Sequence, residues 1–248
     1  MVSMFSLEGK NAAVVGGASG IGEAVATALA EHGASVLCLD VDIAGALDTA
    51  ATITEMGGEA DAGQLNILDG EAVTAAFESF NVKKGSLDIV VCTPGINVRK
   101  PILEYTDEDI DRVLGVNLKG NAHVIQAAGR IMTSQGSGSI ILFSSIRSVV
   151  VEPGQSLYAA TKAGIVQMVR AAAAELGPSG VRVNAIAPGV IDTPLTAPIK
   201  DNPAWYSAYA ERNIFKRWAG AREMAGPTVF LASEAASYVT GTVLFADG

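Results

Sequence analysis

The stretch that decides the fold is Ala12-Ala13-Val14-Val15-Gly16-Gly17-Ala18-Ser19-Gly20-Ile21-Gly22, an apolar run followed by a glycine-rich turn. A helical pattern over residues 20–32 follows at once, so the turn lies between a strand and a helix. Glycines at positions 16, 20 and 22 permit a tight turn and a close approach of the backbone to a pyrophosphate. The start of the helix offers that anion unpaired N–H groups and a positive dipole end. The pattern therefore predicts a dinucleotide-binding turn.

Asp40 stands at the end of the second apolar run, 18 positions past Gly22. A carboxylate there can accept both ribose hydroxyls of an adenosine and would repel a 2′-phosphate. Neither Val41 nor the glycine turn, where Ser19 stands, supplies a basic residue. These features favour NAD over NADP, the alternative being that Asp40 is a plain loop carboxylate.

Short apolar runs alternate with longer helical patterns over the whole chain. The runs are apolar throughout rather than alternating, as in a parallel sheet covered on both faces. They cover residues 12–15, 35–39, 60–64, 87–91, 139–143, 181–186 and 242–246, and the helical patterns cover residues 20–32, 43–56, 70–80, 107–134, 158–176 and 222–231. This order predicts an α/β doubly wound Rossmann fold, with about seven parallel strands and helices on both faces. No linker interrupts it, so we expect one domain over residues 1–248.

The irregular insertion at about residues 194–218 is rich in proline and aromatic residues. It is too long for an ordinary connection between a strand and a helix. We expect it to be a lid over the substrate, and a pair of packed surface helices is the alternative.

Composition narrows the classes of protein. The formal net charge is −9, and no basic patch is visible, so a nucleic-acid partner is not expected. No apolar run reaches ~18 residues and no signal-peptide pattern opens the chain, so we expect neither a membrane span nor secretion. A cytoplasmic location follows as the default expectation.

The cysteines and histidines do not form a metal-binding pattern. Cys38 and Cys92 lie in apolar runs outside any CxxC or CxxH spacing, which predicts buried thiols in a reducing compartment. His32 and His123 fit helix-surface or satisfied core positions better than metal ligands. No metal is expected.

Tyr158 precedes Lys162 by four residues, and Ser145 lies thirteen residues before Tyr158. Four residues is about one helical turn, so the tyrosine and the lysine share a helix face. A nearby ammonium stabilises a phenolate and lowers its pKa, which makes the phenol a usable acid or base. Taken alone, the pair also fits a surface tyrosine and lysine on an amphipathic helix.

Together these motifs resemble the short-chain dehydrogenase/reductase family over essentially the whole chain. The matching residues are the glycine turn, Asn117, Ser145, the run Tyr158-Ala159-Ala160-Thr161-Lys162, and the run Asn184-Ala185-Ile186-Ala187-Pro188-Gly189. The resemblance implies a nicotinamide-dependent dehydrogenase that acts on CH–OH groups, and commonly a homotetramer.

The resemblance also implies a role for each catalytic position. Tyr158 gives or takes the hydroxyl proton, and Lys162 lowers the pKa of that phenol and binds the nicotinamide ribose. Ser145 hydrogen-bonds the substrate oxygen, with Ser144 and Ser148 as competitors that the spacing to Tyr158 disfavours. Asn117, expected in the middle of the helix over residues 107–134, holds a water that relays protons from Lys162.

The expected cofactor contacts combine the turn, Asp40 and positions implied by the resemblance. Asn66 and Ile67 follow the third strand, where the family contacts adenine, and Pro188 with Gly189 begins the segment beside the nicotinamide. Where the family usually has Asn-Asn-Ala-Gly, this chain has Cys92-Thr93-Pro94-Gly95, a departure that puts side-chain roles there in doubt. The full expected set is Gly16, Ser19, Gly20, Ile21, Gly22, Asp40, Asn66, Ile67, Thr93, Gly95, Tyr158, Lys162, Pro188, Gly189, Ile191 and Thr193.

The substrate is the least determined feature. Beside Ser145 and Tyr158 we expect Arg147 to contact it, either as a bidentate clamp for an anion or merely as an exposed loop arginine. Other cations that we expect could approach the substrate pocket are Arg99, Lys100, Lys216 and Arg217.

The segment over residues 193–198 is similar to sugar-acid and polyol members such as gluconate 5-dehydrogenases, and the general pattern is also similar to 3-oxoacyl-carrier-protein reductases. We therefore expect an NAD-linked dehydrogenase of a hydroxy acid, sugar acid or polyol. An acyl-carrier-protein reductase and a catalytically silent NAD-binding sensor are the alternatives.

Overall fold

Seven parallel strands form the central sheet, in the order β3-β2-β1-β4-β5-β6-β9. The computed structural model describes residues 3–248. The strands are β1 (Asn11–Val15), β2 (Ser35–Asp40), β3 (Glu59–Gln64), β4 (Ile89–Cys92), β5 (Gly138–Phe143), β6 (Val181–Pro188) and β9 (Val243–Ala246). Every neighbouring pair runs parallel, which confirms the predicted doubly wound sheet.

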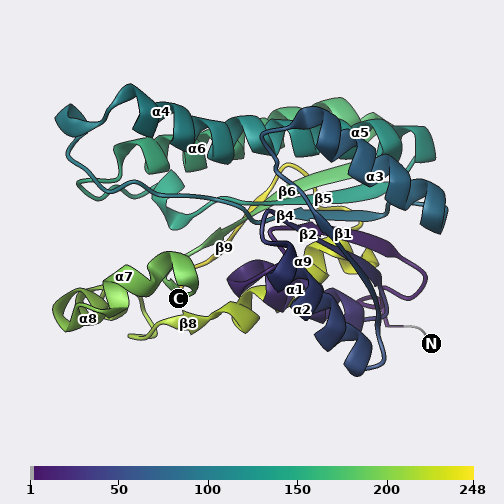
Figure 1. Ribbon diagram of the computed structural model, residues 1–248, viewed down its shortest axis with the longest axis horizontal. Helices are drawn as coiled ribbons and strands as arrows, with labels where there is room; N and C mark the ends of the chain where they lie inside the picture. Colours follow the sequence, from purple (N-terminus) through teal and green to yellow (C-terminus); the bar gives the residue numbers. More distant parts are fainter. Residues whose placement is uncertain (1–2) are drawn as a thin grey trace.

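Helices cover both faces of the sheet (Figure 1). One layer contains α1 (Gly20–Glu31), α2 (Ile43–Glu55) and α9 (Ala225–Ala232), and the other contains α3 (Gly70–Lys84), α5 (Asn121–Gln135) and α6 (Ser156–Leu176). Successive residues of β1 enter different cores: Ala12 and Val14 pack into the first, Ala13 and Val15 into the second. A strand buried on both faces needs apolar residues at every position, which explains the uniform runs in the sequence.

The edge strand β3 is the exception to the apolar pattern. Its residues are only partly buried, and lysines of α3 pair with its acids, Lys83 with Asp61 at 2.7 Å and Lys84 with Glu59 at 2.5 Å. Charged side chains on an edge strand discourage pairing with another sheet.

The prediction of one continuous helix over residues 107–134 was wrong, because a π-helical segment interrupts it. The structure has α4 (Asp107–Leu114), then the π-helical segment η2 (Gly115–Gly120), then α5. Asn117 lies in η2 with none of its surface exposed. Periodicity of 3.6 residues cannot reveal one wider turn, and short π segments are frequent at functional sites.

The insertion after β6 folds into a small unit of its own. It contains β7 (Ile191–Asp192), η5 (Pro194–Thr196), α7 (Ala197–Lys200), α8 (Pro203–Glu211) and β8 (Ala219–Gly220), which pairs with β7. The rings of Tyr206 and Trp218 stack at 5.0 Å, and Ile199 and Tyr209 are buried beside them. Figure 1 shows α7 and α8 projecting beyond the sheet, so the segment does contain packed helices.

Candidate active site

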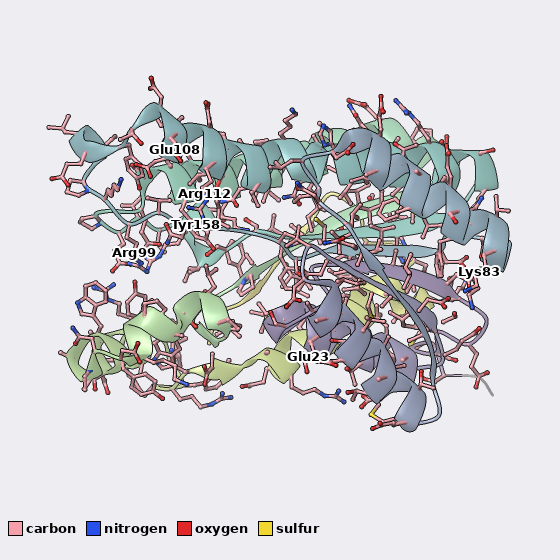
Figure 2. All side chains as sticks on the ribbon, in the orientation of Figure 1. Glu23, Lys83, Arg99, Glu108, Arg112 and Tyr158 are labelled. Carbon is pink, nitrogen blue, oxygen red and sulfur yellow. The ribbon has the colours of Figure 1, made fainter. Side chains whose placement is uncertain are left out.

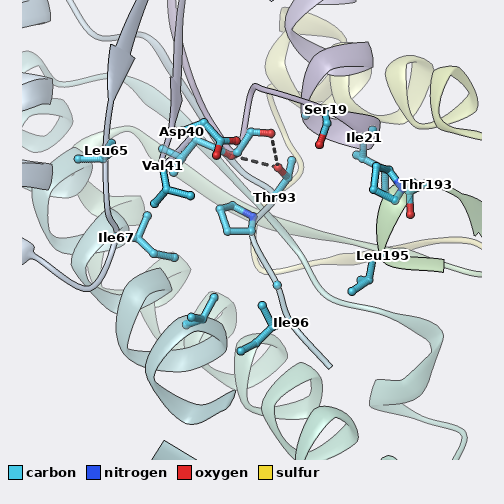
Figure 3. A pocket seen from close by; sticks show the side chains of 18 of the residues that line it. Ser19, Ile21, Asp40, Val41, Leu65, Ile67, Thr93, Ile96, Thr193 and Leu195 are labelled. Atoms are coloured by element: carbon cyan, nitrogen blue, oxygen red, sulfur yellow. Dashed lines mark hydrogen bonds between the residues drawn. The ribbon is translucent and has the colours of Figure 1, made fainter. Parts of the chain in front are cut away.

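A cavity of about 360 Å³ opens where the strand order reverses, beside the carboxyl ends of β1 and β4 (Figure 3). Such a switch point is where open α/β sheets bind ligands. Eleven of the expected cofactor contacts line the cavity: Gly16, Ser19, Gly20, Ile21, Gly22, Asp40, Asn66, Ile67, Thr93, Gly95 and Thr193. Residues that sequence reasoning did not select also line it: Val15, Val41, Leu65, Pro94, Ile96, Val116, Pro194 and Leu195.

The glycine turn is shaped for an anion. A Cβ on Gly22 would lie 1.8 Å from the carbonyl oxygen of Gly16, so no larger residue fits there. Gly20 has a φ of +58°, a conformation that other residues rarely adopt. Ser19 precedes α1 without capping it through its side chain, so the first N–H groups of the helix are left for a phosphate. The turn therefore fits the pyrophosphate of a dinucleotide.

Asp40 lies at the adenosine end expected for such a ligand. Its Oδ2 accepts a hydrogen bond from Ala18 N at 3.1 Å, and its Oδ1 accepts one from Asp42 N at 3.0 Å. These bonds fix the carboxylate on the cavity wall. No lysine or arginine is among the described residues that line this cavity.

Thr93 has a structural role in the segment over residues 92–95, where the departure put side-chain roles in doubt. Its Oγ1 lies 3.1 Å from Val15 O and 3.3 Å from Gly16 O, so the hydroxyl ties the end of β4 to the end of β1. Figure 3 shows these contacts beneath the cavity. Cys92, by contrast, is buried among apolar residues of the sheet.

A second cavity of about 250 Å³ adjoins the first, and Leu195 lines both. The β5–α6 connection and α6 form one side and the insertion with α7 and α8 forms the other. Its lining residues are Asn97, Arg99, Ser145, Ile146, Arg147, Gln155, Tyr158, Gly189, Val190, Leu195, Thr196, Pro198, Ile199, Trp205 and Tyr209. Ser145, Arg147 and Tyr158 thus open into a chamber beside the glycine-turn cavity.

Ser145 and Tyr158 lie together on the wall of this second cavity. Burial raises the pKa of Tyr158, whereas the hydrogen bond with Ser145 and the charges of Arg147 and Arg99 lower it. Figure 2 shows Arg99 and Tyr158 on the side of the sheet that faces α7 and α8. The two arginines stabilise a phenolate in a way that the sequence spacing did not reveal.

Lys162 is buried beneath Tyr158. Its Nζ donates to Phe143 O at 2.8 Å and lies 5.5 Å from the centroid of the tyrosine ring. Burial lowers the pKa of this ammonium to about 8. The charge is therefore held close to its titration point in an almost closed site.

Asn117 fixes the backbone beside Lys162. Its Oδ1 accepts from Ile96 N at 2.9 Å, and its Nδ2 donates to Ile96 O at 2.9 Å and to Thr161 Oγ1 at 3.0 Å. Its carbonyl oxygen accepts from Asn121 Nδ2 at 2.9 Å. The water relay expected here stays a prediction.

The competing serines lie outside the lining of the second cavity. Ser144 Oγ donates to Lys162 O at 2.7 Å, which ties β5 to α6. Ser148 Oγ is buried without a hydrogen-bond partner among the described residues. Ser145 alone of the three lines the second cavity.

The structure places some of the candidate cationic residues at the second cavity and others away from it. Arg147 is not an exposed loop arginine: its side chain is 12% exposed and its Nη2 lies 2.6 Å from Glu152. Arg99 lines the second cavity as well. Lys100 pairs instead with Asp109, Lys216 with Glu211 and Arg217 with Glu223, and none of these three lysines and arginines lines the cavity.

The segment after β6 reaches the second cavity at Gly189. Gly189 lines the second cavity, and a Cβ on it would lie 2.7 Å from Asp247 Cα. The side chain of Ile191 is buried and faces a different hollow, which also contains Phe215 and Met224. Pro188 ends β6 and is buried. Any contact of Ile191 with a cofactor would therefore involve its backbone, as the family resemblance implies.

Several pocket residues were missed by sequence reasoning. Gln155, Trp205 and Tyr209 line the second cavity, and Glu152 joins the arginines from behind it. The aromatic composition of the insertion was a signal for Trp205 and Tyr209. Nothing in the local sequence distinguished Glu152 from an ordinary loop carboxylate.

The remaining cysteines and histidines have structural surroundings. Cys38 and Cys92 are buried free thiols, and burial raises the pKa of each to about 12. His32 Nδ1 lies 2.8 Å from Ala28 O, and His123 Nδ1 lies 2.8 Å from Ile67 O. Within residues 3–248, no cluster of three acidic, cysteine or histidine residues is placed to hold a metal, and no helix has the length and apolarity to cross a bilayer.

Known proteins resemble this chain over nearly its full length. A family model described as enoyl-(acyl carrier protein) reductase matches residues 16–248. The 3-oxoacyl-[acyl-carrier-protein] reductase of Thermotoga maritima is 37% identical over 243 residues, 98% of each chain. The cis-4-hydroxycyclohexanecarboxylate dehydrogenase of Sinomonas cyclohexanicum is 41% identical, covering 96% of this chain and 94% of its own. A gluconate 5-dehydrogenase structure from Burkholderia cenocepacia, in complex with NADP and tartrate, has a TM-score of 0.96 at 32% identity, covering 100% of this chain and 97% of its own.

The fold and the site define an oxidoreductase that uses a nicotinamide dinucleotide and acts on CH–OH groups or the corresponding ketones. The chain belongs to the short-chain dehydrogenase/reductase family.

Proposed function

We propose that this protein is an NAD-linked dehydrogenase whose substrate is a hydroxy acid, sugar acid or polyol. The observation that carries the proposal is that Ser145 and Tyr158 together line a cavity that adjoins the glycine-turn cavity through Leu195. A secondary alcohol in this second cavity would have a proton acceptor within reach and a dinucleotide beside it.

Each catalytic residue has a role that its surroundings support. Bound nicotinamide supplies the acceptor for the hydride. Tyr158 takes the hydroxyl proton in oxidation and returns it in reduction, and Ser145 holds the substrate oxygen. Lys162 keeps a positive charge below the phenol, and Asn117 holds the backbone beside it.

The choice of NAD rests on Asp40. Its fixed carboxylate would repel a 2′-phosphate, and the described lining of the cavity offers no cation to bind one. The solved gluconate 5-dehydrogenase of Burkholderia cenocepacia holds NADP, so the cofactor preference of this chain is a distinct proposal to be measured.

The substrate class is supported by relatives and by the pocket. Relatives include a 2-dehydro-3-deoxy-D-gluconate 5-dehydrogenase of Pseudoalteromonas atlantica (36% identical) and a gluconate 5-dehydrogenase of Gluconobacter oxydans (32% identical). Asn97 lines the second cavity, and its Oδ1 has no hydrogen-bond partner among the described residues, which suits a hydroxylated substrate. The similarity to the Thermotoga maritima reductase keeps an acyl-carrier-protein reductase as the second candidate.

The insertion over residues 194–218 is proposed as the substrate lid. Leu195, Pro198 and Trp205 of this segment line the second cavity opposite Tyr158. A homotetramer and a cytoplasmic location are also proposed, and size-exclusion chromatography with light scattering would measure the assembly directly.

The test is NADH formation over a panel of hydroxy acids, sugar acids, polyols and simple secondary alcohols, each with NAD and with NADP. We expect turnover of a hydroxylated substrate with NAD. The Tyr158→Phe variant should lose at least ~100-fold in kcat, while NADH binding, followed by fluorescence, persists. Reduction of acyl thioesters with NADPH alone would refute the proposal, and NADH binding without turnover of any substrate would indicate a silent sensor.

A further inference from the structure

Glu152 is a partly buried carboxylate at the meeting point of both walls of the second cavity. Its side chain is 18% exposed, and Oε2 lies 2.6 Å from Arg147 Nη2 and 2.5 Å from Gln155 Nε2. The same oxygen accepts a hydrogen bond from the hydroxyl of Tyr209, which belongs to α8. One carboxylate thus joins the start of the catalytic helix to the proposed lid.

Positive charge around Glu152 exceeds its single negative charge. Arg99 Nη1 lies 3.9 Å from Oε2 and Arg212 Nη1 lies 3.8 Å from Oε1, both at longer range than Arg147. Arg99, Arg147 and Arg212 are called the arginine cluster below. Three guanidinium groups around one carboxylate leave a local surplus of two positive charges, and arginine keeps its charge at any ordinary pH.

The surplus faces the substrate cavity. Arg99 and Arg147 line that cavity, whereas Glu152 does not, and no aspartate or glutamate is among the described lining residues. Arg99 is held by Tyr209 Oη at 3.1 Å and lies 5.8 Å from the centroid of the Trp205 ring. Hydrogen bonds among residues 3–248 occupy only Nη2 of Arg147, so its other guanidinium nitrogens remain for a ligand.

We infer that Glu152 is a positioning residue, which holds Arg147 and Tyr209 from behind so that Arg99 and Arg147 bind a carboxylate of the substrate. The inference rests on the proposed function and narrows its substrate class to anionic hydroxy acids and sugar acids. Neutral polyols would bind in the same cavity without a favourable interaction between a carboxylate and its arginines.

The reason for placing a carboxylate behind the arginines is preorganisation. Arginine is a flexible side chain, and binding an anion with it costs the entropy of fixing it. Glu152 fixes Arg147 before any ligand arrives, and a charge-assisted bond of this kind is strong. A fully neutralised site would not attract an anion, but the cluster keeps its surplus.

The experiment measures ligand binding to the enzyme–NADH complex by calorimetry, without turnover. The probes are two matched pairs, gluconate with glucitol and cyclohexanecarboxylate with cyclohexanol, in which one member carries the carboxylate. In the unmodified protein at least one carboxylate should bind about tenfold or more tightly than its neutral partner. Glu152→Gln should weaken that carboxylate about tenfold, the range for a lost charge-assisted bond, and leave the neutral partner and NADH unchanged.

Two further variants separate positioning from general stability. Glu104→Gln removes an exposed carboxylate from a short 3-10 turn and should change none of these affinities. Glu152→Asp retains the charge and should retain more of the preference for carboxylates than Glu152→Gln does.

Several results would overturn the inference. These are equal affinity for both members of each pair, no binding of either carboxylate, tighter carboxylate binding by Glu152→Gln, or an equal loss for the neutral ligands. Because binding is measured without turnover, an inactive enzyme that still prefers carboxylates would refute the dehydrogenase proposal and leave this inference standing.

Discussion

Replacing Lys162 with methionine tests the electrostatics of the site through folding stability. Lys162 is 3% exposed, and burial lowers the pKa of its ammonium from the ordinary 10.5 to about 8. That is roughly 2.5 pH units, and each unit is worth about 1.4 kcal/mol, so holding the charge inside costs the native state about 3 kcal/mol.

The sign of the pH dependence follows from proton binding. Between pH 8 and 10.5 the native state holds fewer protons on Lys162 than the unfolded chain does, so the unmodified protein gains stability as pH rises through this window. Below the window the cost is fully present, and above it the cost is gone. Methionine has no such cost at any pH, but it leaves Phe143 O without its donor, a pH-independent loss of about 1–3 kcal/mol.

The assay is urea unfolding of both proteins without added cofactor, at several pH values across the window. The stability of Lys162→Met relative to the unmodified protein should fall by about 3 kcal/mol as pH rises from 8 to 10.5. Exposed Lys119→Met should show no such trend. Parallel stability curves for Lys162→Met and the unmodified protein would refute the reasoning, because they would mean that the ammonium is solvated. Turnover by Lys162→Met should be lost. The buried charge that destabilises the fold is therefore the one that catalysis requires.

Three other predictions concern the two cavities. Gly22→Ala would place a Cβ 1.8 Å from a backbone oxygen of the turn, so NADH titration should show lost binding and thermal unfolding a lower Tm, whereas Gly226→Ala, with open space around it, should bind NADH normally. Asp40→Ala should raise kcat/KM for NADP about tenfold or more relative to NAD, since a repelling carboxylate is removed; an unchanged ratio would contradict its role as selector. Arg99→Gln should raise the pKa of Tyr158, so the acidic limb of the pH profile for alcohol oxidation should move to higher pH, and an unmoved limb would show that Arg99 does not act on the phenol.

Sequence patterns predicted the fold because its main signals are local. Each strand of the parallel sheet is an apolar run and each helix an amphipathic pattern, and the glycine turn lies at the one place where strand order reverses. The π-helical turn around Asn117 was not predictable, because one extra residue in a turn leaves the apolar pattern almost unchanged. Thr93 likewise looked like a lost family residue, although its hydroxyl joins β4 to β1.

The candidate site was predictable only where its residues follow a fixed spacing. Tyr158 and Lys162 lie four residues apart on α6, so their spacing places them on one helix face, and the family resemblance selected Ser145. The substrate side is different, because Glu152 meets Arg99 from before α4 and Tyr209 from α8 only after the chain has folded. A charged residue in a loop has no local pattern that names its partner. The proposed carboxylate site therefore depends on contacts between distant segments, and the matched carboxylate and neutral ligands test those contacts directly.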